Sequence, residues 1–496
     1  MLLTRAQMQH VEQETFARGI TADVLMEGVG AKLARFVMQF FPRPGLLVCY
    51  AGKGHNAGDA FVAARHLSAA GWRVLVRTPF SRDEFAPLTR DKFDLLRAAV
   101  LTSPFRPSTP QDGPLVQLDA LVGLGARGEL QHPLASLAVE MNTLRREADA
   151  KTVAVDFPSG LDPETGVPGE PCVEADFTAT AGFAKTGLVA DAAINHTGRL
   201  GVLDSPDFIK PDHGNHAELL TAPLLRKAWP PRLYDTNKGM CGRVMLMAGS
   251  RGTLGAAHLC CAGAVKGGAG LVSLAALPDD YELLATTMLP EVMVRPFTHL
   301  TDALALPVDA MAIGPGLGTA HAARTLRVVR EAACPSVIDA DALTIIAHAG
   351  LKHLDSVKGP RLLTPHPGEM QRLLAGKQIG DRAKTAEEFA ARHPVTLLLK
   401  GSRTVIAEKG RALRYNTTGN PGMATGGMGD VLTGICAALL GQGADTYWAA
   451  SIGAWVSGRA AEIAVTRGGA SVESLTPTDV LSHLGRAFES LRAGDF

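Results

Sequence analysis

The sequence has few aromatic residues and no excess of charge of either sign. Aromatic residues make up 5% of the 496, and 49 basic residues balance 49 acidic ones. Nucleic-acid binding would call for clustered lysine and arginine, so we expect no nucleic-acid partner. No apolar run reaches the roughly 20 residues that span a bilayer, so we expect no membrane segment. Charged residues interrupt the first apolar positions, and we expect no secretory signal there.

Two common chemical motifs are missing as well. The seven cysteines form no C-x-x-C pair and show no spacing typical of metal ligands. We therefore expect buried free thiols in a reducing compartment, which predicts a cytoplasmic protein. The motif G-x-x-x-x-G-K-[ST] is also absent, which argues against a P-loop kinase.

Glycine, in contrast, is abundant, with 53 residues or about 11% of the chain against a usual 7% or so. Short apolar runs alternate with helical patterns, which predicts parallel βαβ units and an α/β fold. The predicted strands are 46–50, 73–76, 118–122, 152–156, 244–248, 271–274, 310–313, 336–339, 361–364 and 395–399. A polar stretch at 206–216 divides the series. We therefore predict one domain over residues 1–213 and a second over residues 222–496.

The most informative segment is the glycine loop, residues 420–430, which reads Asn-Pro-Gly-Met-Ala-Thr-Gly-Gly-Met-Gly-Asp before an apolar helical run. Main-chain N–H groups at the start of a helix form an anion site. A carboxylate there is useful if it takes a proton from a hydroxyl that attacks a phosphate. The pattern indicates phosphoryl transfer with Asp430 as the base. The alternative is a turn in which Asp430 only favours the helix start.

Three segments of the first half, 51–59, 119–128 and 156–162, place polar residues and glycine after predicted strands. The carboxyl ends of parallel strands converge on one crevice. Asn56, Asp119 and Ser159 together offer hard oxygen ligands for an alkali or alkaline-earth cation, which leaves Asp156 for acid–base work. The alternative is that each is a turn or cap residue. Residues 123–128 spell G-x-G-x-x-G, but they come too late in the chain for the dinucleotide fingerprint.

These segments resemble the three motifs of the NAD(P)H-hydrate epimerase family, also called the YjeF N-terminal domain. The resemblance implies a Rossmann-like, three-layer domain that uses one potassium ion. Asn56, Asp119 and Ser159 would hold the potassium, and Asp156 would lie beside the reacting nicotinamide ring. The residues implied in substrate binding are His55, Asn56, Ala57, Gly58, Asp59, Gly123, Leu124, Gly125, Ala126, Arg127, Gly128, Glu129 and Asp156.

The second half has further glycine-rich strand ends at 249–257, 314–318 and 364–369. Prolines on both sides of His366 stiffen the backbone, which suits a side chain held against a ligand or an ordinary helix start. Lys400 follows a predicted strand and is either a snorkelling surface residue or a nucleotide contact. Asp339 and Asp341 either order water around magnesium or start a helix.

Together, these motifs and the glycine loop resemble the ADP/ATP-dependent NAD(P)H-hydrate dehydratases, a ribokinase-like α/β family. The resemblance implies that Ala256, Gly316, His366 and Asp430 contact the hydrated nicotinamide substrate. It also implies that Lys400, Gly401, Ser402, Arg403, Thr404 and Gly429 hold ADP or ATP, with one magnesium ion.

The sequence thus predicts an enzyme that epimerises hydrated NADH and NADPH and dehydrates the S form with ADP or ATP; we expect a homo-oligomer. One alternative is a ribokinase-like kinase of a small vitamin-precursor alcohol with an N-terminal nucleotide-binding module. Another treats the first half as a metabolite- or RNA-binding module. It rests on His55 and Ala57, which depart from the usual epimerase sequence.

Overall fold

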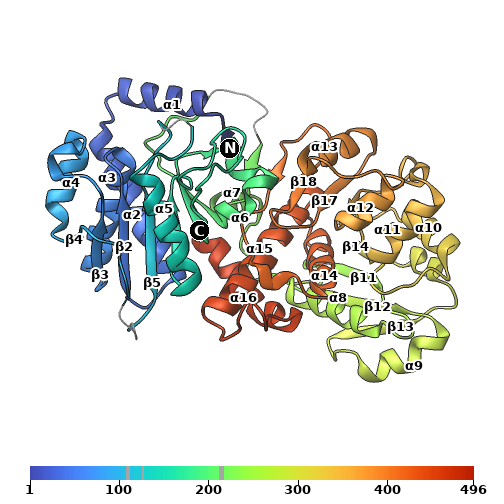
Figure 1. Cartoon of the computed structure of the whole chain (residues 1–496). Helices are drawn as coiled ribbons and strands as arrows, with labels where there is room; N and C mark the ends of the chain where they lie inside the picture. Colours follow the sequence, from blue (N-terminus) through green and yellow to red (C-terminus); the bar gives the residue numbers. More distant parts are fainter. Residues whose placement is uncertain (108–111, 126–127, 212–216) are drawn as a thin grey trace. The chain divides into compact units, whose positions relative to one another are not determined.

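The computed structural model describes residues 1–107, 112–125, 128–211 and 217–496. The chain divides into two compact units, Met1–His216 together with Phe496, and Ala217–Asp495 (Figure 1). In the described part of the chain, no helix is both long and apolar enough to cross a membrane.

The first unit is built on a parallel sheet that, among the described residues, has the strand order β4-β3-β2-β5-β6-β7-β9. Its strands are β2 (Leu46–Ala51), β3 (Arg73–Arg77), β4 (Ala99–Leu101), β5 (Leu115–Ala120), β6 (Lys151–Val155), β7 (Phe177–Ala181) and β9 (Arg199–Leu203). A short parallel pair joins β1 (Leu2–Leu3) to β8 (Ala184–Lys185).

Helices cover both faces of this sheet (Figure 1). The helices of the unit are α1 (Arg5–Ala17), α2 (Ala22–Phe40), α3 (His55–Ala69), α4 (Pro87–Leu96), α5 (Leu134–Glu147) and α6 (Ile194–Thr197). Side chains alternate along β2, as they must in a strand. Leu47 and Cys49 join the core formed with α2 and α3, whereas Leu46 and Val48 join the core formed with α5. The result is the predicted three-layer arrangement.

The second unit has a larger sheet, with the order β10-β19-β18-β17-β16-β15-β14-β11-β12-β13 among the described residues. Its strands are β10 (Glu218–Leu219), β11 (Arg243–Met247), β12 (Leu271–Ala276), β13 (Val292–Pro296), β14 (Ala310–Ile313), β15 (Ser336–Ile338), β16 (Arg361–Leu363), β17 (Thr396–Leu399), β18 (Val405–Ala407) and β19 (Arg414–Tyr415). In the order of the sheet, all the strands from β17 across to β13 are parallel to one another. Strand β18 is antiparallel to both of its neighbours.

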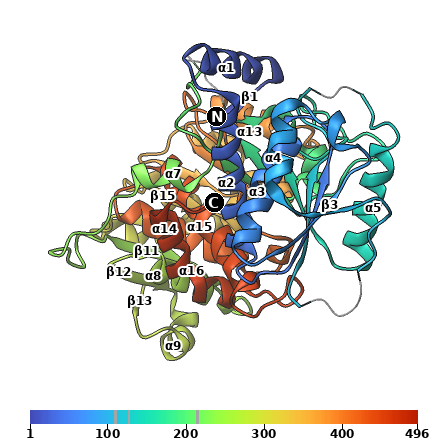
Figure 2. The same ribbon diagram turned by 90° about the vertical axis from the view of Figure 1, so that its left-hand side faces the viewer.

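Helices of the second unit also lie on both faces of its sheet. They are α7 (Ala222–Leu225), α8 (Leu254–Lys266), α9 (Pro278–Thr287), α10 (Ala322–Glu331), α11 (Ala340–Ala349), α12 (Pro367–Leu373), α13 (Arg382–Arg392), α14 (Met428–Gly441), α15 (Thr446–Thr466) and α16 (Pro477–Ala493). One large apolar core joins α8, α14, α15 and α16 to the sheet, and these helices group together in both views (Figures 1 and 2).

Glycine allows α8 and α14 to cross at main-chain contact. A β-carbon at Gly434 would collide with the carbonyl oxygen of Cys260, and one at Gly263 would collide with that of Val431. Any side chain at either position would force the helices apart. The high glycine content therefore serves helix packing here as well as turns.

The predicted α/β class is confirmed in both units, and the predicted strand 310–313 coincides with β14. The strand predicted at 118–122 was displaced, since β5 runs from Leu115 to Ala120. Gln117 interrupts the apolar run, but it is buried and donates to the Met141 carbonyl and the Thr152 hydroxyl. A polar side chain with buried partners thus concealed the true start of the strand.

Candidate active sites

The first candidate site lies where the strand order of the first unit reverses, between β2 and β5. In open α/β sheets, ligands bind in the crevice at the carboxyl ends of the strands at such a point. Helix α3 begins at His55, shortly after β2 ends, and Asp119 lies near the end of β5. The sequence therefore brings two of its predicted clusters to this edge.

Asn56, Asp119 and Ser159 come together at this edge. One carboxylate oxygen of Asp119 accepts the Ser159 hydroxyl at 2.6 Å, and the other accepts the Ser159 main-chain N–H at 2.7 Å. Ser159 Oγ accepts the N–H of Val122 at 3.2 Å, while Asn56 donates to the carbonyl of Val122 at 2.8 Å. The three side chains are thus joined through one loop residue.

Asp119 is fully buried, and among the described residues no lysine, arginine or histidine contributes to its electrostatic surroundings. Burial raises its pKa to about 6 although Ser159 and the Leu121 N–H donate to it. A buried carboxylate without a cationic partner is costly. Its oxygens, with the hydroxyl and amide oxygens beside it, fit a hard cation. No cluster of three or more His, Cys, Asp or Glu in the described residues could hold a metal alone.

Asp156 follows β6 in a strained left-handed conformation, with φ of 70°. Such strain in a non-glycine residue persists only where surrounding contacts impose it, and it clusters at functional sites. Its Oδ1 accepts the Thr180 hydroxyl at 3.1 Å, the Ala181 N–H at 3.0 Å and the ammonium of Lys185. Lys185 was not predicted from the sequence, where a lone lysine in an apolar stretch was its only signal.

The other predicted substrate residues differ in exposure. His55 is exposed at the start of α3, Asp59 is half-buried, and Ala57 and Gly58 are buried, with Gly58 packed against Met26. Leu124 packs against the apolar core, and the Gly125 carbonyl accepts from Arg5 at 3.2 Å. Gly123 lies beside Asn56, and Gly128 and Glu129 are exposed. The predicted residues Ala126 and Arg127 lie outside the described residues.

The second candidate site surrounds the start of α14. Gly427 caps this helix in the left-handed region, with φ of 91°, which glycine adopts without strain. Asp430 lies in the first turn of the helix. A helix start of this kind presents main-chain N–H groups and the positive end of the helix dipole to an anion.

A buried lysine–carboxylate pair adjoins this helix start. Lys400, which follows β17, contacts Asp339 at 2.8 Å and Glu369 at 3.8 Å. Thr433 of α14 donates to the other Asp339 oxygen at 2.7 Å. A β-carbon at Gly429 would lie 3.2 Å from Lys400 Nζ, so glycine at this position leaves room for the ammonium. Thr433 was missed from the sequence, because a threonine inside a helix carries no signal of its own.

The charges of this cluster act on Asp430. Burial raises its pKa to about 7; the charge of Asp339 adds to the shift, and that of Lys400 opposes it. For Lys400, burial alone would lower the pKa, but Asp339 and Glu369 outweigh burial and raise it. At neutral pH the site therefore combines a cationic lysine with a carboxyl group that exchanges its proton readily. That is the profile of a general base.

The remaining motifs form the neighbouring strand ends. Gly316 packs against Ala256, and its carbonyl accepts the hydroxyls of Ser250 and Thr253 at 2.9 and 2.7 Å. His366 caps α12, where its Nδ1 accepts the N–H of Gly368 at 3.0 Å. The structure thus places Ala256 beside Gly316. The side chain of His366 is half-exposed.

The predicted nucleotide residues 400–404 form the turn between β17 and β18. Gly401 has φ of 147°, and a β-carbon there would meet the guanidinium of Arg382. Arg382 also donates to the Ser402 carbonyl at 2.7 Å, and the Thr404 hydroxyl donates back to the Gly401 carbonyl at 3.0 Å. Arg403 adopts a positive φ of 58°. The turn is therefore held in one shape by its own contacts and by a neighbouring helix.

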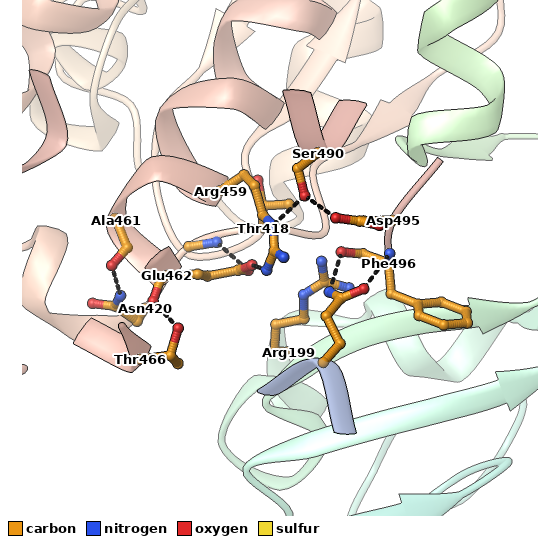
Figure 3. A network of polar contacts seen from close by, with 12 residues as sticks. Arg199, Thr418, Asn420, Arg459, Ala461, Glu462, Thr466, Ser490, Asp495 and Phe496 are labelled. Atoms are coloured by element: carbon orange, nitrogen blue, oxygen red, sulfur yellow. Dashed lines mark hydrogen bonds and ion pairs between the residues drawn. The ribbon is translucent and has the colours of Figure 1, made fainter. Parts of the chain in front are cut away.

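The chain leading into the glycine loop is held by the buried middle of α15 (Figure 3). The Glu462 carboxylate, 4% exposed, pairs with Arg459 at 2.9 Å and accepts the main-chain N–H of Gly419 at 3.0 Å. The Asn420 amide donates to the main chain of the same helix, and Arg459 donates to Ser490 of α16. A buried ion pair thereby fixes the chain at Gly419, eleven residues before Asp430.

Both units are α/β units with glycine-rich strand ends beside acidic side chains, and open α/β sheets of this class bind ligands at the carboxyl ends of their strands. A profile of the family described as NAD(P)H-hydrate dehydratase matches residues 244–485, and one described as YjeF-related protein N-terminus matches residues 22–187.

Curated relatives match the chain across both units. The chain is 37% identical to a bifunctional NAD(P)H-hydrate repair enzyme Nnr of Moorella thermoacetica, covering 94% of this chain and 93% of the relative. It is 34% identical to the Escherichia coli protein of that name, covering 94% and 90%. An ADP/ATP-dependent NAD(P)H-hydrate dehydratase of Bacillus subtilis, co-crystallised with ATP and Mg²⁺, is 29% identical with a TM-score of 0.48, covering 55% of this chain and 99% of that one. The chain belongs to the family of bifunctional NAD(P)H-hydrate repair enzymes.

Proposed function

We propose that the two units repair hydrated NADH and NADPH in successive steps. The first unit interconverts the R and S hydrates, and the second dehydrates the S form with ADP or ATP, giving NAD(P)H, phosphate and AMP or ADP. The observation that carries the second step is Asp430, a carboxyl group that titrates near neutral pH at a helix start beside Lys400. Relatives named bifunctional NAD(P)H-hydrate repair enzymes match the chain across both units, which supports assigning an activity to each.

The chemistry of dehydration requires a base and an anion site. The hydrate carries a hydroxyl on C6, and hydroxide is a poor leaving group. Asp430 takes the hydroxyl proton while the oxygen attacks the terminal phosphorus of the nucleotide, which leaves as AMP or ADP. The C6–O bond then breaks with its electron pair going to phosphate, the N1 lone pair forms a double bond to C6, and loss of a C5 proton restores the dihydropyridine.

The residues around Asp430 are suited to charge that develops on the phosphoryl group. Lys400 and the main-chain N–H groups of residues 427–430 would stabilise that charge, and they need no rearrangement because Asp339 and Thr433 already fix the lysine and the helix. One magnesium ion bound with the nucleotide would neutralise part of the phosphate charge. Ala256, Gly316 and His366 would contact the hydrated ring, and residues 400–404 with Gly429 the nucleotide.

In the first unit, Asp156 would act on the C6 hydroxyl of the hydrate. Asn56, Asp119 and Ser159 would hold one potassium ion, whose charge would compensate the buried Asp119 carboxylate and fix the loops around the substrate. His55, Asp59 and residues 123–129 would line the substrate crevice. Ala57 and Gly58, which are both buried, would belong to the wall of the same crevice.

The direct test is the recovery of dihydronicotinamide absorbance from a mixture of R and S hydrates. Mixed hydrate with ADP or ATP should be repaired completely, and omission of the nucleotide or of Mg²⁺ should abolish recovery. Omission of K⁺ should leave the R half unrepaired except by its spontaneous epimerisation. A stable phosphorylated alcohol in place of recovered NAD(P)H would favour the vitamin-precursor kinase and contradict the proposal.

A further inference from the structure

The turn proposed to bind the nucleotide, residues 400–404, is anchored to its surroundings at both ends. At its start, the N–H of Lys400 donates to the Pro365 carbonyl at 2.8 Å. At its end, the Thr404 carbonyl accepts the N–H of Asn416, also at 2.8 Å. These contacts fix where the turn begins and ends, but they do not reach the residues between.

The middle of the turn contains two residues with positive φ. Gly401 has φ of 147°, and Arg403 has φ of 58°. A non-glycine residue in the left-handed region is strained, and it persists only where the surrounding structure imposes it. The Thr404 hydroxyl donates to the Gly401 carbonyl at 3.0 Å, but it belongs to the turn and moves with it. Support that does not move with the turn has to come from another element.

Arg382, the first residue of α13, supplies such support. Its Nη2 donates to the Ser402 carbonyl at 2.7 Å. Its Nη1 lies 2.6 Å from the place that a β-carbon of residue 401 would take, so the guanidinium crosses the turn over Gly401. Glycine at this position therefore serves two purposes. It adopts a φ of 147° without strain, and it leaves room for the guanidinium.

Helix α13 gives the Arg382 side chain a fixed base. The Asp381 carboxylate caps the helix by accepting the N–H of Lys384 at 3.0 Å. Phe389 of the same helix is buried, and the helix packs against β17 and β18. These are the two strands that the turn connects, so the helix holds the guanidinium in place relative to the strands that carry the turn.

We propose that Arg382 is a positioning residue for nucleotide binding, which keeps the 400–404 turn in the conformation that receives ADP or ATP and does not itself touch the phosphates. The inference rests on the nucleotide site proposed above and adds a residue outside every motif predicted from the sequence. A turn that spends only part of its time in the binding conformation binds its ligand more weakly by that fraction. This fraction is a property of the free protein, so all adenine nucleotides should lose affinity by the same factor.

The test measures the binding of AMP, ADP and ATP to the full chain by calorimetry, with Mg²⁺ present. Arg382→Met removes the donor but keeps an unbranched side chain. Each of the three Kd values should rise by about 3–10-fold, the effect of one hydrogen bond of ordinary net strength. In the dehydration of pure S hydrate, KM for ADP should rise by the same factor, while kcat and KM for the hydrate stay unchanged. Without nucleotide, the amides of residues 401–404 should exchange faster with deuterium.

Two further variants separate the contact from the charge. Arg382→Lys keeps a cationic donor and should restore part of the affinity. Lys384→Met is the matched control, because it removes a positive charge from an exposed position in the first turn of the same helix. It should leave all three Kd values unchanged.

Three results would overturn the inference. A loss that grows from AMP to ADP to ATP would mean that Arg382 contacts the phosphates directly. Unchanged Kd values with a lower Tm would mean that the arginine only supports the fold. An equal loss in Lys384→Met would mean a general effect of charge.

Failure of the proposed function would give a different result. If the unaltered chain binds ADP but does not dehydrate S hydrate, the dehydratase proposal fails, and the three Kd values still decide the role of Arg382. If the unaltered chain binds no adenine nucleotide, the nucleotide site is wrong and the inference falls with it.

Discussion

Each unit holds a lysine beside carboxylates, but the lysine contacts a different member of the cluster in each. In the first unit Lys185 contacts Asp156, the proposed base itself. In the second, Lys400 contacts Asp339 at 2.8 Å, and its attraction for Asp430 acts from farther away. The cation thus touches the proposed base in the first unit and a neighbour of the proposed base in the second.

The largest expected effect is on Asp430. Asp430→Asn keeps the shape of the side chain but removes its basicity, so dehydration of S hydrate should fall by about 10²–10⁴-fold. ADP binding, measured by calorimetry, should persist because Lys400 and the 400–404 turn are untouched. Epimerisation by the same protein is the internal control. Near-normal dehydration would show that Asp430 is not the base.

Asp156→Asn should cause a comparable loss of epimerisation, part of which spontaneous epimerisation hides. Epimerisation should fall by about 10²-fold or more, while pure S hydrate is still dehydrated at the normal rate. With a racemic mixture, absorbance should recover in two phases, half at once and half at the spontaneous rate. A single fast phase would show that Asp156 is not needed and would leave the first unit without its proposed base.

The buried Arg459–Glu462 ion pair holds the chain that leads to Asp430, and a substitution of Glu462 tests its contribution. Glu462→Gln removes the negative charge of the buried Arg459–Glu462 ion pair, and breaking a buried pair costs about 3–5 kcal/mol of stability. Urea unfolding of the full chain, followed by loss of dehydration, should show this cost while epimerisation survives to higher urea. The matched control, Arg459→Met with Glu462→Leu, removes both charges and should cost less. Equal losses in the two variants would contradict a charge effect.

The smallest effect is the pH dependence of dehydration. Because the pKa of Asp430 is raised to about 7, the base loses its charge as pH falls through 7, and kcat/KM for dehydration should fall about tenfold per unit below that value. A pH profile of the dehydration of pure S hydrate measures this. A rate that stays constant through this pH range would contradict the proposed role of Asp430.

Much of both candidate sites could be predicted, because the sequence signals of their residues are local. Asp119, Asp156 and Asp430 each follow or precede an apolar run with glycine nearby, and strand ends of parallel sheets gather at one edge. The lysine contacts could not be predicted in this way. Lys185 lies 29 residues from Asp156, and Lys400 lies 61 residues from Asp339. Such pairs are created by the order of strands in the sheet, which no local pattern encodes.

The same contrast between local signals and distant contacts holds for the fold. Long apolar runs such as β14 stand out, whereas the two-residue strands β10 and β19 pair with each other across 196 residues and carry no periodic signal. The contact between Glu462 and Gly419 is similar, since a glutamate inside a helix gives no sign that it accepts a loop N–H 43 residues away.

The crossing of α8 and α14 at Gly263 and Gly434 has a kinetic consequence. Helices that touch through their main chains cannot slide or tilt without separating at these two contacts. We therefore expect the helix bearing Asp430 to stay still when ligands bind. In hydrogen–deuterium exchange, the amides in the middle of α14 should be among the last to exchange in the second unit, with or without ligand.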